Sequence, residues 1–159
     1  MIFGEPLQLA AEIRRLVGVG GIIGVDGWLG AGKSFLAEAL AASTQGEAVD
    51  LDVYLETNRN CYVAALRLEE ISSRLSGGGL LFVSGICLRH VLHLIGVEAK
   101  AHVYIKRMAS WGWADEEEIS GALLEFPNSS GVKLREELRQ YHAEWQPHTK
   151  ADFEYQRFT

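Results

Sequence analysis

Short apolar runs alternate along this chain with longer segments whose apolar residues recur at helical spacing. The short runs predict buried strands over Gly20–Asp26, Glu47–Asp52, Leu80–Ser84, Ala101–Lys106 and Ala151–Arg157. The longer segments predict helices that begin at Pro6, cover Lys33–Ala42, Leu66–Leu75, Cys87–Ile95 and Glu116–Glu125, and follow the face formed by Leu134, Leu138, Tyr141 and Trp145. Strands that alternate with helices predict an α/β fold in three layers, a parallel sheet of about five strands with helices on both faces.

Start and stop signals mark the ends of several of these helices. Pro6 suits the first turn of a helix, and Asp115 with Glu118 three residues later has the pattern of a capping box. Gly77 and Gly96 follow the last apolar residues of their helices, where glycine commonly ends a helix. No repeat, charge block or Pro/Ser-rich linker divides the chain, so we expect a single domain over residues 1–159.

The composition is that of an ordinary globular domain and excludes several classes of protein. Of the 159 residues, 48% are hydrophobic and 23% charged, which argues against a disordered, collagen-like or disulfide-rich chain. The formal net charge of −6 argues against a dedicated nucleic-acid-binding protein. No apolar run reaches the roughly 18 residues of a membrane helix, and no secretory signal is visible. We therefore expect a cytoplasmic protein with no nucleic-acid or membrane partner, in which Cys61 and Cys87 are free thiols.

The segment Gly27–Ser34, with the sequence GWLGAGKS, fits the phosphate-binding pattern G-x-x-x-x-G-K-[ST] at every fixed position. It follows a predicted strand and opens a predicted helix, which is the context of a phosphate-binding loop, or P-loop. Glycines let the backbone turn tightly and bring its N–H groups against phosphate oxygens, and the N-terminus of the following helix adds a positive potential. The predicted nucleotide-binding residues are Gly27, Gly30, Ala31, Gly32, Lys33, Ser34 and Phe35.

The motif also assigns roles to two side chains. Lys33 is expected to reach the β- and γ-phosphates of a nucleoside triphosphate, and the Ser34 hydroxyl to ligate Mg²⁺. Two common classes of P-loop protein do not fit, because the chain has no Asn-Lys-x-Asp motif of a Ras-like GTPase and its strand Leu80–Ser84 does not end in the acid of an ATPase motor. A small ATP-dependent kinase remains.

Between about Ile22 and Tyr155 the chain resembles the uridine kinase-like family of P-loop phosphotransferases. The stretch IIGVDGWLGAGKS looks like the start of that family, and VDLDVY, which ends at Tyr54, looks like its second strand with an acid followed by an aromatic residue. The segment LFVSGI resembles its third strand, although Ser84 stands where the family has an acid before the glycine. The pattern from Tyr141-His142 through Pro147 to Ala151-Asp152 resembles its ending.

The resemblance implies a three-layer P-loop NTPase fold and a kinase that transfers the γ-phosphoryl group of Mg-ATP to a hydroxyl of a nucleoside-like or other small acceptor. It also implies that Asp52 activates that hydroxyl and lies near Mg²⁺, so Ser34 and Asp52 are the predicted metal-binding residues. Because Ser84 replaces an acid, two alternatives stay open: a nucleotide-binding sensor or interaction module with little catalysis, and a slow NTP hydrolase. The acceptor, the base preference and the oligomeric state are not predicted.

Further candidates lie at the predicted carboxyl edge of the sheet, where open α/β sheets bind ligands. Arg107 joins Lys33 and Asp52 as a predicted catalytic residue, because a cation there would stabilise charge on the transferring phosphoryl group; a solvated loop residue is the alternative. Asp50 and Asp26 are additional acidic candidates. The remaining candidates would line an acceptor pocket (Tyr54, Arg59, Tyr62), stack on a ring (Trp111, Trp113) or act from a lid helix (Lys133, Arg135, Arg139).

Overall fold

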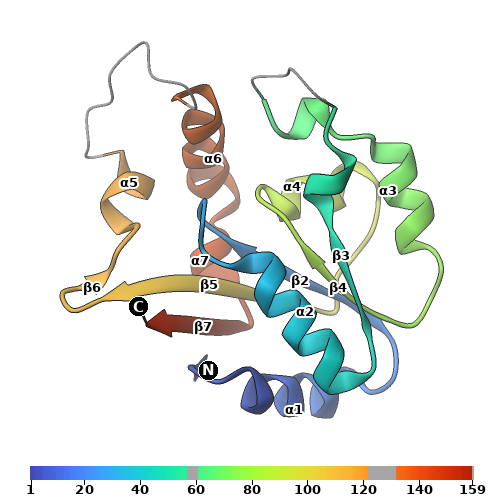
Figure 1. The fold of residues 1–159 in the computed structure, drawn as a ribbon. Coiled ribbons are helices and arrows are strands. Elements are labelled where there is room, and N and C mark those ends of the chain that lie inside the picture. Colours follow the sequence, from blue (N-terminus) through green and yellow to red (C-terminus); the bar gives the residue numbers. More distant parts are fainter. Residues whose placement is uncertain (57–60, 122–131, 159) are drawn as a thin grey trace.

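The computed structural model describes residues 1–56, 61–121 and 132–158, and its centre is a twisted β-sheet (Figure 1). Within these described ranges this sheet has seven strands, and the main path runs in the order β1 (Ile2–Phe3), β7 (Phe153–Phe158), β5 (Ala101–Ala109), β2 (Gly21–Gly27), β4 (Leu80–Ser84) and β3 (Glu47–Asp50). All neighbours on this path are parallel, and β6 (Gly112–Trp113) pairs antiparallel with the end of β5. The predicted parallel α/β sheet is confirmed.

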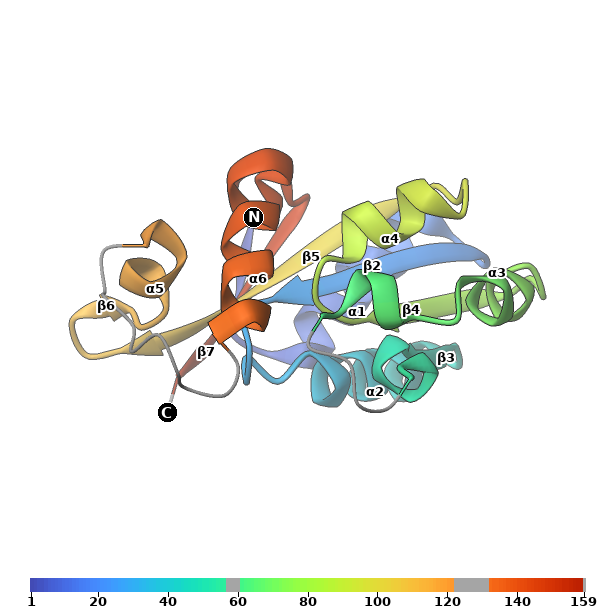
Figure 2. The same cartoon turned by 90° about the horizontal axis from the view of Figure 1, so that it is seen from above.

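Helices cover both faces of the sheet, which makes the fold three-layered (Figure 2). On one face lie α1 (Pro6–Val17) and α2 (Lys33–Thr44), and on the other lie α3 (Leu68–Leu75), α4 (Leu88–Leu94) and α6 (Val132–Trp145). Each face has its own apolar core, one around Leu40 of α2 and one around Leu138 of α6. The shorter helices are η1 (Leu51–Tyr54), η2 (Val63–Ala65), α5 (Glu116–Ser120) and α7 (Pro147–Lys150).

Burial on both faces explains why the central strand β4 has a continuous apolar sequence. Every residue of β4 is buried, and its sequence LLFVS shows no alternation of apolar and polar positions. Such a pattern is typical of a parallel strand covered by helices on both sides. The predicted limits of this strand agree with the structure, because Gly79 and Gly85 bound the apolar run.

Several predicted boundaries are wrong, and each has a local cause. The second predicted strand ends at Asp50 rather than Asp52, because the Asp50 carboxylate accepts the Asp52 N–H at 2.9 Å and starts the 3-10 helix η1. The short strands β1 and β6 were not predicted, because two residues carry no periodicity. The predicted strand Ala101–Lys106 continues to Ala109, since β7 and β6 provide partners as far as that residue.

The helix predicted over Glu116–Glu125 also differs. In the structure α5 ends at Ser120, and Gly121 follows with φ of 74°, a left-handed conformation that glycine adopts readily. Residues 122–125 lie outside the described part of the chain. The predicted capping box is wrong as well, because Asp115 makes no capping hydrogen bond and its carboxylate instead pairs with Arg107.

The strand order places the functional candidates at one edge of the sheet. The chain crosses from β2 to β3, which lies beyond β4 on one side, and later returns to β5 on the other side of β2. The loops after these parallel strands diverge near the end of β2, which is where open α/β sheets form their ligand-binding crevice. In the described part of the chain, no helix is both long and apolar enough to cross a membrane.

Candidate functional site

The P-loop connects β2 to α2, and two of its glycines have backbone conformations that other residues rarely adopt. Gly30 has φ of 73° and Gly32 has φ of 95°. Gly32 is also the N-cap of α2, so the unpaired N–H groups of the first helical turn lie next to the loop. This backbone has the form in which a helix N-terminus binds an anion.

A cavity of about 290 Å³ lies beside the P-loop at the carboxyl edge of the sheet. It brings together the P-loop, the segment after β3 and the end of β4, which are far apart in the sequence. Its lining residues are Gly30, Gly32, Lys33, Ser34, Asp50, Asp52, Ser84 and Gly85. The side chains predicted to bind phosphate and metal, Lys33, Ser34 and Asp52, therefore lie around the same cavity.

The other predicted nucleotide-binding residues, Gly27 and Ala31 of the P-loop and Phe35 of α2, do not line the cavity. Gly27 and Ala31 are buried, and a Cβ added to Gly27 would lie 3.1 Å from the Ala31 Cβ and 3.2 Å from the Ile105 carbonyl oxygen. The first turn of the loop is thus packed tightly against β5. The Phe35 side chain is 73% exposed on the first turn of α2, so it points away from the core.

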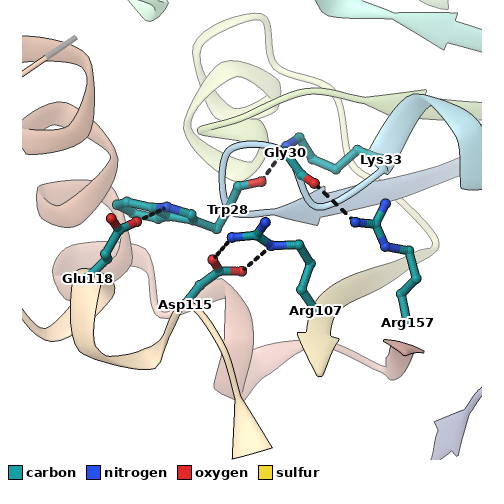
Figure 3. Close-up of polar contacts among 7 residues, drawn as sticks. All are labelled: Trp28, Gly30, Lys33, Arg107, Asp115, Glu118 and Arg157. Atoms are coloured by element: carbon teal, nitrogen blue, oxygen red, sulfur yellow. Dashed lines mark hydrogen bonds and ion pairs between the residues drawn. The ribbon is translucent and has the colours of Figure 1, made fainter. Parts of the chain in front are cut away.

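Lys33 folds back onto its own loop. Its Nζ donates a hydrogen bond to the Trp28 carbonyl oxygen at 2.8 Å (Figure 3). Burial lowers the pKa of Lys33, because the low-dielectric surroundings disfavour the charged ammonium, while the carboxylates of Asp26, Asp52 and Asp50 act in the opposite direction. At the edge of the cavity Lys33 is therefore held by the Trp28 carbonyl and by the nearby aspartate carboxylates.

The two aspartates after β3 have different partners. Asp50 caps η1 through the Asp52 N–H, and burial raises the pKa of its carboxyl group. Asp52 is exposed, and its Oδ1 accepts a hydrogen bond from the Tyr62 hydroxyl at 2.7 Å. Among the described residues its Oδ2 has no hydrogen-bond partner, so one carboxylate oxygen is fixed and the other is available.

Ser84 ends β4 and lines the cavity. Its side chain is 1% exposed, and its Oγ has no hydrogen-bond partner among the described residues. The strand register places it beside Asp50 of β3. A buried hydroxyl without a partner carries an energetic cost unless a ligand or water completes it, so the cavity wall here suits a polar ligand.

Arg107 lies at the carboxyl end of β5 but does not line the cavity. Its guanidinium is bound to the buried carboxylate of Asp115, with Nε 3.2 Å from Oδ2 (Figure 3). The hydrogen bonds and charge of Asp115 raise the pKa of Arg107. In this structure Arg107 is therefore fixed beside the P-loop by an ion pair, and its predicted contact with a phosphoryl group stays a prediction.

Two contacts hold the P-loop from outside. The Trp28 indole, 2% exposed, donates from Nε1 to Glu118 Oε2 of α5 at 2.8 Å. On the C-terminal strand, Arg157 Nη2 lies 3.5 Å from the Gly30 carbonyl oxygen. Sequence analysis gave no role to Arg157, although its position at the end of the last predicted strand already indicated the carboxyl edge of the sheet.

Asp26, directly before the loop, has a buried side chain in a chain of hydrogen bonds. Its Oδ1 accepts the Gly27 N–H at 2.8 Å, its Oδ2 accepts the Tyr141 hydroxyl, and that hydroxyl oxygen accepts the Arg89 N–H at 3.0 Å. Burial raises the pKa of Asp26 to about 6, against the opposing effect of these hydrogen bonds and of Lys33. Asp26 thus ties the start of the P-loop to α6 and does not line the cavity.

Most of the remaining candidates lie away from the cavity. Tyr62 contacts Asp52, as described above, whereas Tyr54 packs against the core on the α6 face. Arg59 lies outside the described residues. Trp111 is 80% exposed, and Trp113 lines a separate cavity of about 580 Å³ between α5, α6 and α7.

The basic residues of the predicted lid lie on α6. Arg139 Nε donates to the Glu118 carbonyl oxygen at 2.7 Å, so it joins α6 to α5. Lys133 is exposed and Arg135 is half-buried. None of these three side chains lines the P-loop cavity as the structure describes it.

Comparison with known proteins supports the fold. A solved structure described as a possible uridine kinase from Bacillus stearothermophilus matches with a TM-score of 0.62 and 13% sequence identity, over 94% of this chain and 97% of that chain. A shikimate kinase from Bacteroides thetaiotaomicron matches with a TM-score of 0.45 and 18% identity, over 86% of each chain. No protein-family model matches the chain, and no curated protein matches it significantly. The first likeness shows that the chain has the fold of P-loop kinases.

Proposed function

We propose that this chain is an ATP-dependent phosphotransferase of the uridine kinase-like type, which transfers the γ-phosphoryl group of Mg-ATP to a hydroxyl of a small, nucleoside-like acceptor. The observation that carries the proposal is the cavity in which the P-loop, Lys33 and Asp52 meet. A phosphate cradle with a carboxylate beside it is the minimum that phosphoryl transfer to a hydroxyl requires. The P-loop kinase fold supports the same conclusion.

The donor atoms around the cavity fit a Mg²⁺ ion that is bound together with phosphates. Ser34, Asp50 and Asp52 supply oxygen atoms, which Mg²⁺ prefers, and Ser84 Oγ, which has no hydrogen-bond partner among the described residues, lies in the same cavity wall. Among the described residues no group of three or more His, Cys, Asp and Glu side chains is arranged to hold a metal, so phosphate oxygens and water would complete the coordination. When bound, Mg²⁺ would neutralise charge on the β- and γ-phosphates.

The chain's own residues would bind the phosphates, orient the acceptor and take the proton from its hydroxyl. Lys33 would move from the Trp28 carbonyl to the phosphate oxygens, a stronger acceptor for an ammonium group. Asp52 would face the acceptor with Oδ2, while Tyr62 holds Oδ1. As the acceptor oxygen bonds to the γ-phosphorus and the bond to the ADP oxygen breaks, Asp52 would take the hydroxyl proton.

The test is ADP release from Mg-ATP with and without a panel of nucleosides, vitamins and small alcohols. We expect one acceptor class to stimulate release, and Lys33→Ala to lower the stimulated rate by about 100-fold or more, because the variant lacks the cation on the phosphates. Phosphate release at the same rate without any acceptor would identify a slow hydrolase instead.

A nucleotide-binding sensor is the second candidate, and Ser84 favours it. P-loop ATPases hold Mg²⁺ through an acid at this place, whereas Ser84 offers an uncharged hydroxyl. The sensor predicts saturable ATP binding by calorimetry with no acceptor-stimulated ADP release. Stimulation by any acceptor would exclude it.

A further inference from the structure

Arg157, on the C-terminal strand β7, lies against the P-loop (Figure 3). Its Nη2 lies 3.5 Å from the Gly30 carbonyl oxygen, and a Cβ placed on Gly32 would fall 2.6 Å from its Nη1. The guanidinium therefore occupies the space that a side chain at position 32 would need. Because Gly32 directly precedes Lys33, Arg157 brings a second positive charge to the phosphate-binding loop.

Arg157 differs from its neighbour on β5 in how its charge is balanced. The strand register pairs Arg107 with Arg157, so the two residues lie side by side at the carboxyl edge of the sheet. Arg107 is neutralised by the buried carboxylate of Asp115. Arg157 forms no ion pair with any described residue, and its buried Nε has no hydrogen-bond partner there.

The contact with Gly30 is a weak substitute for an ion pair. A separation of 3.5 Å between donor and acceptor is at the long limit for a hydrogen bond, and a carbonyl carries no net charge. A guanidinium presents its N–H donors as a planar fork that matches two phosphate oxygens. A guanidinium that has no carboxylate partner among the described residues and lies beside the P-loop is therefore arranged for an anionic ligand.

We infer that Arg157 binds the phosphate groups of the nucleotide on the Gly30–Gly32 side of the loop. The inference rests on the proposed function, because it assigns a further side chain to the same nucleotide. Arg157 is a binding residue, whereas Asp52 is the residue that would contact the acceptor. A guanidinium also stacks on aromatic rings, so contact with the nucleobase is the competing result that the test must separate.

The experiment measures dissociation constants for two Mg²⁺ complexes, one with a non-hydrolysable ATP analogue and one with tripolyphosphate, which has no base or ribose. The variants are Arg157→Gln, Arg157→Lys and the charge-matched control Arg14→Gln, whose exposed side chain lies on α1. We expect Arg157→Gln to weaken both ligands about tenfold, because a charge-assisted hydrogen bond is lost. Arg157→Lys keeps the charge but not the planar guanidinium, so its affinity for both ligands should fall less. Arg14→Gln should bind both ligands as tightly as the original chain does.

Thermal unfolding of each variant verifies that it is folded, and Arg157→Lys keeps the test open if Arg157→Gln is unstable. Unchanged affinity of a folded Arg157→Gln variant for both ligands would overturn the inference; if that variant does not fold, unchanged affinity of Arg157→Lys for both ligands would do so. So would a loss confined to the ATP analogue, because the contact would then be with the base or ribose. If the original chain binds neither ligand, the proposed function itself fails; if it binds both without transferring phosphate, only the kinase assignment fails.

Discussion

At the scale of single residues, the site depends on how two carboxylates are held. Asp52 is exposed and has one oxygen fixed by Tyr62, whereas Asp26 is buried and has both oxygens occupied, by Gly27 and Tyr141. A carboxylate that takes the proton of the acceptor hydroxyl needs a free oxygen at the surface of the cavity. The surroundings therefore favour Asp52 as the base of the proposed transfer, whereas the contacts of Asp26 hold the start of the P-loop.

Replacing Asp52 by Asn should separate binding from transfer. The amide keeps the size and the contact with Tyr62 but cannot take a proton, so we expect acceptor-stimulated ADP release to fall by about 100-fold or more. Nucleotide affinity, measured by calorimetry, should fall far less than the transfer rate, because Lys33, Ser34 and the backbone of the P-loop are unchanged. Transfer at the original rate in Asp52→Asn would show that Asp52 is not the base.

Asp26 should make stability depend on pH. Its pKa rises from 3.8 to about 6 in the folded chain, so between these values the folded state holds a proton that the unfolded state has lost. The folded state is thus penalised as the pH rises through this window, and the contribution of Asp26 to the free energy of unfolding should fall by about 2 kcal/mol between about pH 4.5 and pH 7. Urea unfolding at the two pH values should show this decrease relative to Asp26→Asn; parallel changes in both proteins would contradict the assignment.

At the scale of elements, α6 holds the site together from one face of the sheet. Three of its side chains form hydrogen bonds to other elements: Tyr141 to Asp26 before the P-loop, Glu137 to the backbone at the start of η2, and His142 to Tyr104 of β5. Burial lowers the pKa of His142 to about 4, so near neutral pH the ring is uncharged: Nδ1 donates to the Leu138 carbonyl and Nε2 accepts from the Tyr104 hydroxyl. One helix face therefore fixes the P-loop and the segment next to Asp52.

Glu137 provides a test of this role. Its carboxylate accepts the N–H groups of Tyr62 and Val63 at 2.7 and 3.1 Å, which positions the tyrosine that contacts Asp52. Glu137→Ala should lower the free energy of unfolding by about 1–3 kcal/mol and speed hydrogen exchange at both amides, because two N–H groups lose a charged acceptor. The exposed neighbour offers the control Glu136→Ala, which should change neither. Equal effects of the two variants would mean that α6 does not hold this segment.

At the scale of the whole molecule, the order of the strands decides which residues meet. Placing β4 between β2 and β3 brings Ser84 beside Asp50 and near the P-loop. Placing β7 beside β5 brings Arg157 beside Arg107 and onto Gly32. The cavity is therefore a product of the topology, because its lining residues come from connections that only the assembled sheet brings together.

Local sequence determined the class of fold and the phosphate-binding loop. Apolar periodicity predicts strands and helices because each element must bury one face or both, and the spacing of Gly27, Gly32, Lys33 and Ser34 predicts a P-loop because its backbone geometry is local. The shortest strands were not predicted, because two residues are too few to show a periodicity. The end of β3 was misplaced, because the Asp50 side chain caps a 3-10 helix where the strand was expected to continue.

Only the tertiary structure decided which charged side chains form ion pairs and which lie against the P-loop. The sequence placed Asp115 at a helix start and Arg107 at a strand end, but their ion pair depends on how β5 and β6 turn back together. It placed Arg157 at the end of a strand, but the contact with Gly32 exists because β7 packs beside β5. Pairing between distant segments is set by the packing of the whole sheet, which no window of neighbouring residues contains.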